Sequence, residues 1–145
     1  MSPGPQSVTG EFFKIVAEDF RALPKIQVFN KYSGKIIKSS GTIQSLEYLS
    51  GKNVSKIVIL VHSEDQNDPK YDQRTVELLR GKGRDGRYLV DKYLVVIEYP
   101  GTEIALNYKK GDNFSFQGSF IDIRQDPTLA GYPSYDFYIY FKPII

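Results

Sequence analysis

The chain has 145 residues, and 19 lysines and arginines against 17 aspartates and glutamates leave a formal net charge of +2. This length is typical of a single domain, and the charge is too balanced to argue for recognition of nucleic acid through bulk charge. Because the chain has no cysteine, it can form no disulfide, zinc–thiolate site, iron–sulfur cluster or cysteine nucleophile. Its 11 tyrosines and 9 phenylalanines favour a mainly β protein, because both residue types fit pleated, half-buried surfaces.

The N-terminal region predicts a short lead and one helix. Residues 1–8 are rich in Pro, Gly and Ser and predict a disordered lead. Apolar residues then recur at helical spacing over about residues 11–23, with Thr9 as the N-cap and Pro24 ending the helix. For residues 25–32 two interpretations stay open, a second short helix that begins after Pro24 or an extended strand.

Apolar and polar residues alternate in five later segments, and this pattern predicts five core strands. Glycine interrupts the first strand at Gly41 and the fourth at Gly118, and an interior strand glycine marks a bulge or a bend. Residues 75–80 and 87–99 flank a Gly-rich tip and predict a long hairpin, whereas residues 102–108 are too short and mixed to assign. The predicted core strands cover residues 35–48, 55–62, 87–99, 113–123 and 135–142.

These elements together predict an OB fold. Five core strands, a bent first strand, an elaborated connection before the third strand and a helix free to plug one end describe a five-stranded OB-fold barrel. We therefore expect a mainly β chain in which residues 9–145 form a single OB-fold domain with an N-terminal helix and a long inserted β-hairpin. Such a barrel points to a binding scaffold rather than a catalytic one.

Two blocks of sequence make this expectation more specific. Lys31-Tyr-Ser-Gly-Lys35 leads to Ser40-Gly-Thr-Ile43, and Leu106-Asn-Tyr-Lys-Lys-Gly-Asp-Asn-Phe-Ser-Phe-Gln-Gly118 follows later. These motifs, which consist mostly of structural glycines, resemble the tRNA_anti-like group of bacterial OB proteins over about residues 29–46 and 94–123. The resemblance implies the fold more than a function, since many members of that group have no assigned role. The long insertion before the third core strand departs from the compact pattern of the group.

The tip of the predicted hairpin is basic. Its residues 81–86, Gly-Lys-Gly-Arg-Asp-Gly, match the dinucleotide-binding pattern G-x-G-x-x-G, but that site needs a helix next, and the following residues alternate like a strand. We therefore predict a flexible basic tip rather than a nucleotide site. Its basic side chains can contact phosphates or an acidic partner, and these candidate ligand-binding residues are Arg80, Lys82, Arg84 and Arg87.

The last strand holds a second candidate site. Tyr138 and Tyr140 alternate with the apolar side chains of the core face and share their own face with Lys142. Exposed tyrosines beside a lysine form a surface on which bases or sugars stack, so both tyrosines are candidate ligand-binding residues. In the alternative arrangement the N-terminal helix covers this face, and the need of that helix to bury its apolar stripe favours this second arrangement.

Neither catalysis nor metal binding is indicated. His62 is the only histidine, and the acidic residues after it lack the spacing of a calcium loop. The sequence contains no Walker or G-x-S-x-G pattern, and its acidic residues fall in loops or at strand ends. We therefore expect a protein that is not an enzyme and that uses no metal or other cofactor.

The leading hypothesis is a non-catalytic OB-fold binding or interaction module whose ligand is a protein or a glycan. The alternative is a single-stranded nucleic-acid-binding protein that stacks bases on Tyr138 or Tyr140. In that alternative, phosphates are bound by Lys35, Lys38, Arg80, Lys82 and Arg84.

The sequence also bears on location. No apolar run approaches the length needed to span a bilayer. The absence of cysteine, and the export signals that often precede members of the tRNA_anti-like group, favour a location outside the cytoplasm, in the periplasm or cell envelope. We expect the natural open reading frame to begin with a leader ahead of Val8 that this chain lacks.

Overall fold

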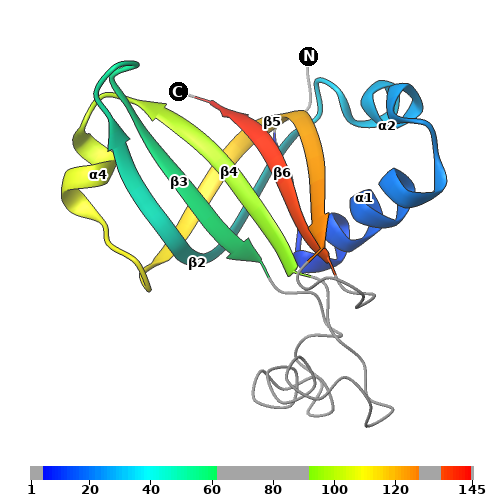
Figure 1. Cartoon of the computed structure of the whole chain (residues 1–145), viewed down its shortest axis with the longest axis horizontal. Helices are drawn as coiled ribbons and strands as arrows, with labels where there is room; N and C mark the ends of the chain where they lie inside the picture. Colours follow the sequence, from blue (N-terminus) through cyan, green and yellow to red (C-terminus); the bar gives the residue numbers. More distant parts are fainter. Residues whose placement is uncertain (1–4, 62–91, 128–134, 145) are drawn as a thin grey trace, which may run out of the picture.

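The structure, a computed structural model, describes residues 5–61, 92–127 and 135–144 (Figure 1). The tip of the predicted hairpin and most of its two strands lie outside these residues. Figure 1 shows α1 and α2 beside one end of a sheet and α4 at the opposite end. In chain order the elements are β1 (Gln6–Ser7), α1 (Gly10–Ala22), α2 (Lys25–Tyr32), β2 (Ile36–Leu49), β3 (Val54–Val61), β4 (Lys92–Pro100), α4 (Glu103–Asn107), β5 (Asn113–Pro127) and β6 (Tyr135–Pro143).

The six strands form one sheet in the order β1-β2-β3-β4-β6-β5, and β2 also pairs with β5. The pairs β1–β2 and β4–β6 are parallel, and the other pairs are antiparallel. Because β2 pairs with both β3 and β5, the sheet closes partly into a ring (Figure 1). The expected mainly β chain with an N-terminal helix is confirmed, and a sixth strand, β1, joins the five that the sequence predicted.

β1 lies in the segment that we expected to be a disordered lead. Gln6 and Ser7 pair with Ile37 and Lys38 of β2, and the Val8 N–H donates to the Lys38 carbonyl at 3.0 Å. The expectation of disorder therefore does not hold for Gln6–Ser7. Both side chains are exposed, so this strand is held through its backbone. Its sequence has no apolar pattern from which a strand could be predicted.

The first long strand, β2, changes partner near its glycine. Its first half pairs with β5 and its second half with β3. A Cβ at Gly41 would lie 2.3 Å from the Leu60 carbonyl oxygen of β3, and a Cβ at Gly118 would lie 2.8 Å from the Lys142 carbonyl oxygen of β6. Both glycines therefore mark places where two strands approach more closely than a side chain allows.

The N-terminal helix forms where the sequence predicts it. The Glu11 N–H donates to the Thr9 hydroxyl oxygen at 3.4 Å, which caps α1. Phe13 and Val16 of α1 are fully buried. The ring of Phe13 contacts the rings of Phe116 on β5 and Phe141 on β6, so α1 packs its apolar stripe against the inner side of the partly closed sheet.

The second helix decides between the two interpretations of residues 25–32. These residues form α2, so the extended strand is the wrong alternative. Gly34, two residues after the helix, has a φ of 79°, a conformation that glycine adopts without strain and that commonly ends helices. Tyr32, the last residue of α2, is buried against Phe120 of β5.

The segment that the sequence left unassigned contains a short helix, α4. A buried hydroxyl of the sheet hydrogen-bonds to it, and Ile104 of α4 packs against the core. Ser55 of β3 is fully buried; its hydroxyl donates to the Gly101 carbonyl at 2.8 Å and accepts from the Ala105 N–H at 3.1 Å. The Ala105 N–H is one of the first amides of α4, which have no partner within the helix, and the same hydroxyl also ties the helix to the Gly101 carbonyl just before it.

The core lies inside the ring and alternates along the strands as predicted. Ile57, Ile59 and Val61 of β3 are buried at every second position, as are Phe137, Ile139 and Phe141 of β6.

Among the helices of the described ranges, none combines the length and apolar character that crossing a bilayer requires.

Candidate binding groove

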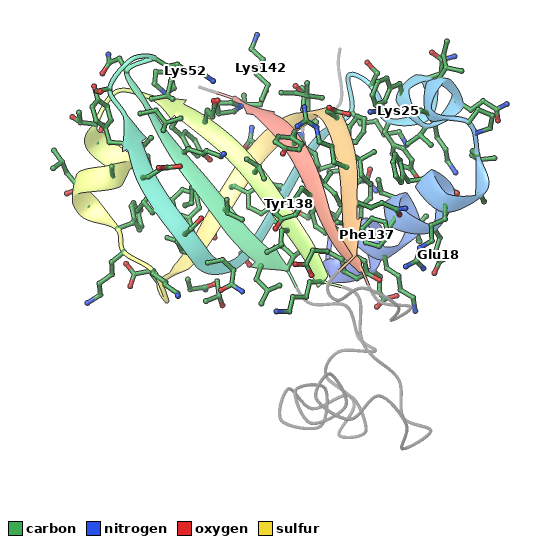
Figure 2. The ribbon with its side chains drawn as sticks, in the orientation of Figure 1. Glu18, Lys25, Lys52, Phe137, Tyr138 and Lys142 are labelled. Carbon is green, nitrogen blue, oxygen red and sulfur yellow. The ribbon has the colours of Figure 1, made fainter. Side chains whose placement is uncertain are left out.

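The outer face of the sheet carries the two tyrosines singled out from the sequence. Tyr138 and Tyr140 are half-buried and alternate with the core residues of β6. Figure 2 shows Tyr138 in the middle of β6 and Phe137 next to it, near α1. The predicted alternation of the two faces of β6 is thus confirmed for the residues from Phe137 onward.

The N-terminal helix does not cover these tyrosines. Its buried residues meet the core side of the strands, where Phe13 contacts Phe141, and its Arg21 guanidinium lies 4.9 Å from the ring centre of Phe137. The favoured expectation, that α1 lies over Tyr138 and Tyr140, is therefore wrong. The physical reason is that the ring is open at the end beside α1, so the helix stripe buries itself against the phenylalanines of the interior.

Apolar side chains continue across the outer face in a row. Val58 of β3 pairs with Val96 of β4, which pairs with Tyr140 of β6, which pairs with Asp122 of β5. Although Val96 faces outward and lies outside the main core cluster, only 3% of it is exposed. Val58, Val96 and Tyr140 therefore form an apolar strip on the outside of the sheet, and Asp122 ends it.

This strip is part of a groove of about 510 Å³. Val96, Ile121 and Pro143 contribute apolar surface, and Tyr140 lies among them. Ile121 is 53% exposed, an unusual exposure for a large aliphatic side chain in a strand. The groove also has a charged rim, to which four elements and the turn after β2 contribute Lys52, Lys56, Glu98, Asp122, Arg124 and Lys142.

Both carboxylates of the rim are held in ion pairs. Glu98 lies 3.4 Å from the Lys52 ammonium, and Asp122 lies 3.5 Å from the Arg124 guanidinium and 3.3 Å from the Lys25 ammonium. The Arg124 guanidinium also lies 5.2 Å from the ring centre of Tyr140, a cation–π contact. The pairs are partly exposed, so each contributes little to stability and leaves the rim adaptable.

Two further lysines of the rim have no such partner. Within the described parts of the chain, neither Lys56 nor Lys142 takes part in an ion pair or hydrogen bond through its ammonium. Lys52 and Lys142 lie near the same end of the strands, one in the turn after β2 and the other near the end of β6 (Figure 2). The groove therefore combines an apolar floor with a rim that carries more positive than negative charge.

A second, larger groove of about 670 Å³ lies along β1, β2 and β5. Its polar lining consists mainly of short hydroxyl side chains, and one of them, Ser39, already donates to the Val8 carbonyl of the β1 segment at 2.8 Å. Tyr99 also lines it, and burial, with a smaller effect of Tyr108, raises the pKa of Tyr99 to about 12. This groove contains Lys38 but neither candidate tyrosine.

The structure assembles only part of the predicted site. Tyr140 lines the first groove, whereas Lys38 lines the second and Lys35 lies over the ring of Tyr32. The basic candidates of the hairpin tip lie outside the described residues and stay predictions, and they are Arg80, Lys82, Arg84 and Arg87. Sequence reasoning missed Lys56, Arg124 and the apolar floor, because they come together only through the strand order.

Comparison with known proteins adds no assignment. No protein-family model matches the chain, and no curated protein matches it significantly. The resemblance to the tRNA_anti-like group therefore stays an expectation based on the two quoted blocks. In the described ranges no three histidine, cysteine or carboxylate side chains lie close enough together to hold a metal ion, and His62 falls outside those ranges.

Proposed function

We propose that the chain is a non-catalytic OB-fold binding module that engages a protein or glycan ligand through the groove of Tyr140. The OB assignment is supported by the ring of five strands, β2-β3-β4-β6-β5, which closes between β2 and β5. OB folds are five-stranded, partly open barrels that bind ligands over their second and third strands and the loop that joins the first two. In this ring those parts are β3, β4 and the turn after β2.

The position of the groove carries the functional proposal. Lys52 comes from the turn after β2, Lys56 from β3, and Val96 and Glu98 from β4. The groove thus overlaps the part of the ring that OB proteins use for binding and extends from there over β6 and β5. An apolar floor inside a polar rim is also the usual anatomy of a protein interface. The rim carboxylates are engaged by cations, which suits a binding surface better than acid–base chemistry.

Single-stranded nucleic acid is the second candidate ligand. Tyr138 and Tyr140 lie on the outside of the sheet, and Arg124 and Lys142 lie beside Tyr140 in the groove. Aromatic side chains next to cations bind single strands by stacking and by phosphate contacts. This ligand predicts an affinity for oligonucleotides that falls steeply with added salt, because phosphate contacts release counterions.

Arrays of peptides, glycans and oligonucleotides, probed with the full chain, test the proposed function. Substitutions at Ile121 and at Ile15 make the test specific to the groove, because Ile121 lines the groove and Ile15 of α1 does not. The two side chains are matched in exposure, at 53% and 51%. We expect Ile121→Glu to abolish binding of whichever ligand is retained and Ile15→Glu to keep it. Equal binding by both variants, or no retained ligand of any class, would overturn the proposal.

A further inference from the structure

The two lysines without ion pairs indicate which ligand chemistry the groove accepts. We propose that its occupant is an extended segment of a partner protein in which acidic side chains flank an apolar one. This inference rests on the proposed function and narrows its ligand class. The observations behind it are the spacing of Lys56 and Lys142, the apolar surface of Ile121, Tyr140 and Pro143 in the same groove, and the presence of carboxylates in the rim.

The sheet fixes the spacing of the two lysines. Lys56 of β3 pairs with Glu98 of β4, and the parallel register that pairs Ile97 with Phe141 brings Lys142 of β6 beside Glu98 on its other side. Neighbouring strands lie about 4.8 Å apart, so Lys56 and Lys142 are separated by about 10 Å across the sheet. An extended peptide advances about 3.3 Å per residue, and only every second side chain points to the same side. Two acidic residues four positions apart, about 13 Å, therefore face the groove together with the residue midway between them, and the flexible stems of the two lysines cover the remaining difference.

The floor provides the place for the apolar residue of the ligand. Ile121 is 53% exposed and lies in the same groove as Val96 and Pro143. Burying an aliphatic side chain of a ligand there stabilises the complex by roughly 25 cal/mol for each Å² of apolar surface removed from water. A volume of about 510 Å³ lies in the range of ordinary ligand pockets and suits a few residues rather than a folded domain.

The charges of the rim favour a peptide over a polynucleotide. Glu98 and Asp122 place two carboxylates among the cations, so the groove suits a ligand with a few separated acidic groups better than one that carries a charge on every phosphate. The backbone N–H groups of a peptide, by contrast, can donate hydrogen bonds to these carboxylates. Arg124 already occupies one face of the Tyr140 ring, which reduces the surface for stacking a base or a sugar.

Fluorescence anisotropy with three pools of short synthetic peptides tests the proposal on the full chain. In the first pool glutamate and aspartate flank leucine or phenylalanine, in the second their amides replace the acids, and in the third lysine replaces them. We expect the acidic pool to bind at least about tenfold more tightly than the amide pool, the equivalent of about 1.4 kcal/mol. We also expect its affinity to fall with added salt.

Paired charge reversals locate the interaction. We expect Lys56→Glu with Lys142→Glu to weaken binding of the acidic pool by at least about tenfold. The control Lys109→Glu with Lys110→Glu makes the same change of charge in an exposed turn outside the groove and should leave binding unchanged. Melting curves check that both double variants fold. We expect a small loss of stability for the groove variant, because it places two glutamates beside Glu98, and no change for the turn variant.

The outcomes separate this inference from the proposed function. If the acidic and amide pools bind equally well, and Ile121→Glu abolishes the binding of both, the inference of an acidic ligand is overturned. The proposed function as a binding module then still stands. Oligonucleotide or glycan binding in this groove, with no binding of the acidic pool, would have the same consequence. Equal weakening by both double variants would also overturn the inference, because it would show bulk attraction of charge. If no peptide, glycan or oligonucleotide binds, both the inference and the proposed function fail.

Discussion

The Tyr32 hydroxyl of α2 donates a hydrogen bond to the Asp19 carboxylate of α1 at 2.5 Å. The Lys31 ammonium donates to the same oxygen at 2.7 Å. The ring of Tyr32 meanwhile packs against Phe12 of α1 and Phe120 of β5. This one residue therefore joins the two helices to each other and both of them to the sheet, which fixes how α1 closes the open end of the ring.

The hydroxyl of Tyr32 should contribute measurably to stability. Tyr32→Phe keeps the ring and removes the hydrogen bond to Asp19, so we expect the free energy of unfolding to fall by about 1–2 kcal/mol. Urea denaturation measures it. Tyr108→Phe is the matched control, because Tyr108 makes a ring contact with Phe114 but no hydrogen bond through its hydroxyl in the described part of the chain. Equal stability of the two variants would contradict the role given to Tyr32.

The same contact predicts a dependence of stability on pH. The hydrogen bond from Lys31 and then that from Tyr32 hold the pKa of the Asp19 carboxyl below its ordinary value of 3.8. A lowered folded-state pKa contributes stability above the unfolded value, and this stability is lost as the pH falls through the folded value. Asp19→Asn should therefore be less stable than the parent at neutral pH, and the difference should shrink below about pH 4. A difference that stays constant down to about pH 2 would rule out this linkage.

Ser55 should be essential for α4. Ser55→Ala leaves the Gly101 carbonyl and the Ala105 N–H without the hydroxyl that serves both, and we expect a loss of about 1–3 kcal/mol. Hydrogen exchange should show faster exchange of the Ala105 amide and of the neighbouring α4 amides. Ser115→Ala, at an exposed site of β5, is the control and should cost less than about 0.5 kcal/mol. Unchanged protection of α4 in Ser55→Ala would refute the assignment.

Close strand approach predicts the cost of adding one methyl group. Gly41→Ala and Gly118→Ala should both lower the melting temperature, Gly41→Ala more, because its Cβ would lie 2.3 Å from a carbonyl oxygen and that of Gly118 2.8 Å from one. Gly51→Ala is the matched control, since a Cβ at Gly51 meets no atom within 4 Å. We expect several degrees of loss for the first two, equivalent to about 1 kcal/mol or more. Three equal melting temperatures would show that the strands are not this close.

The long periodic elements could be predicted from the sequence, since periodicity records which face each residue presents. The alternation of β3 and β6 and the stripe of α1 are of this kind. A bulge or bend was expected at Gly41 and Gly118, whereas the irregular register lies a few residues later, between Ile43 and Ser45 of β2 and between Phe120 and Asp122 of β5. The glycines themselves mark the close approach of Leu60 and Lys142. The periodic strands and the helix depend on residues close together in the sequence, and the two glycines stand out because they have no side chain.

Contacts between distant residues could not be predicted in this way. α4 depends on Ser55, and β1 on backbone pairing with β2, so neither has a pattern of its own. The groove requires Lys56 and Tyr140 to lie on strands separated only by β4, which follows from the parallel pairing of β4 with β6. Alternation placed Tyr140 on the outer face but did not show that α1 would pack on the other.

NMR titration of the isotope-labelled chain with the acidic peptide pool tests the central claim most directly, because each backbone amide reports on its own surroundings. We predict that the largest shifts map to Lys56, Val96, Ile121, Tyr140 and Lys142, which line the groove. Amides of the second groove, such as Ser40 and Ser115, should remain unchanged. Shifts concentrated in the second groove, or saturable binding without shifts in the first, would contradict the claim that the outer face of the sheet binds the ligand.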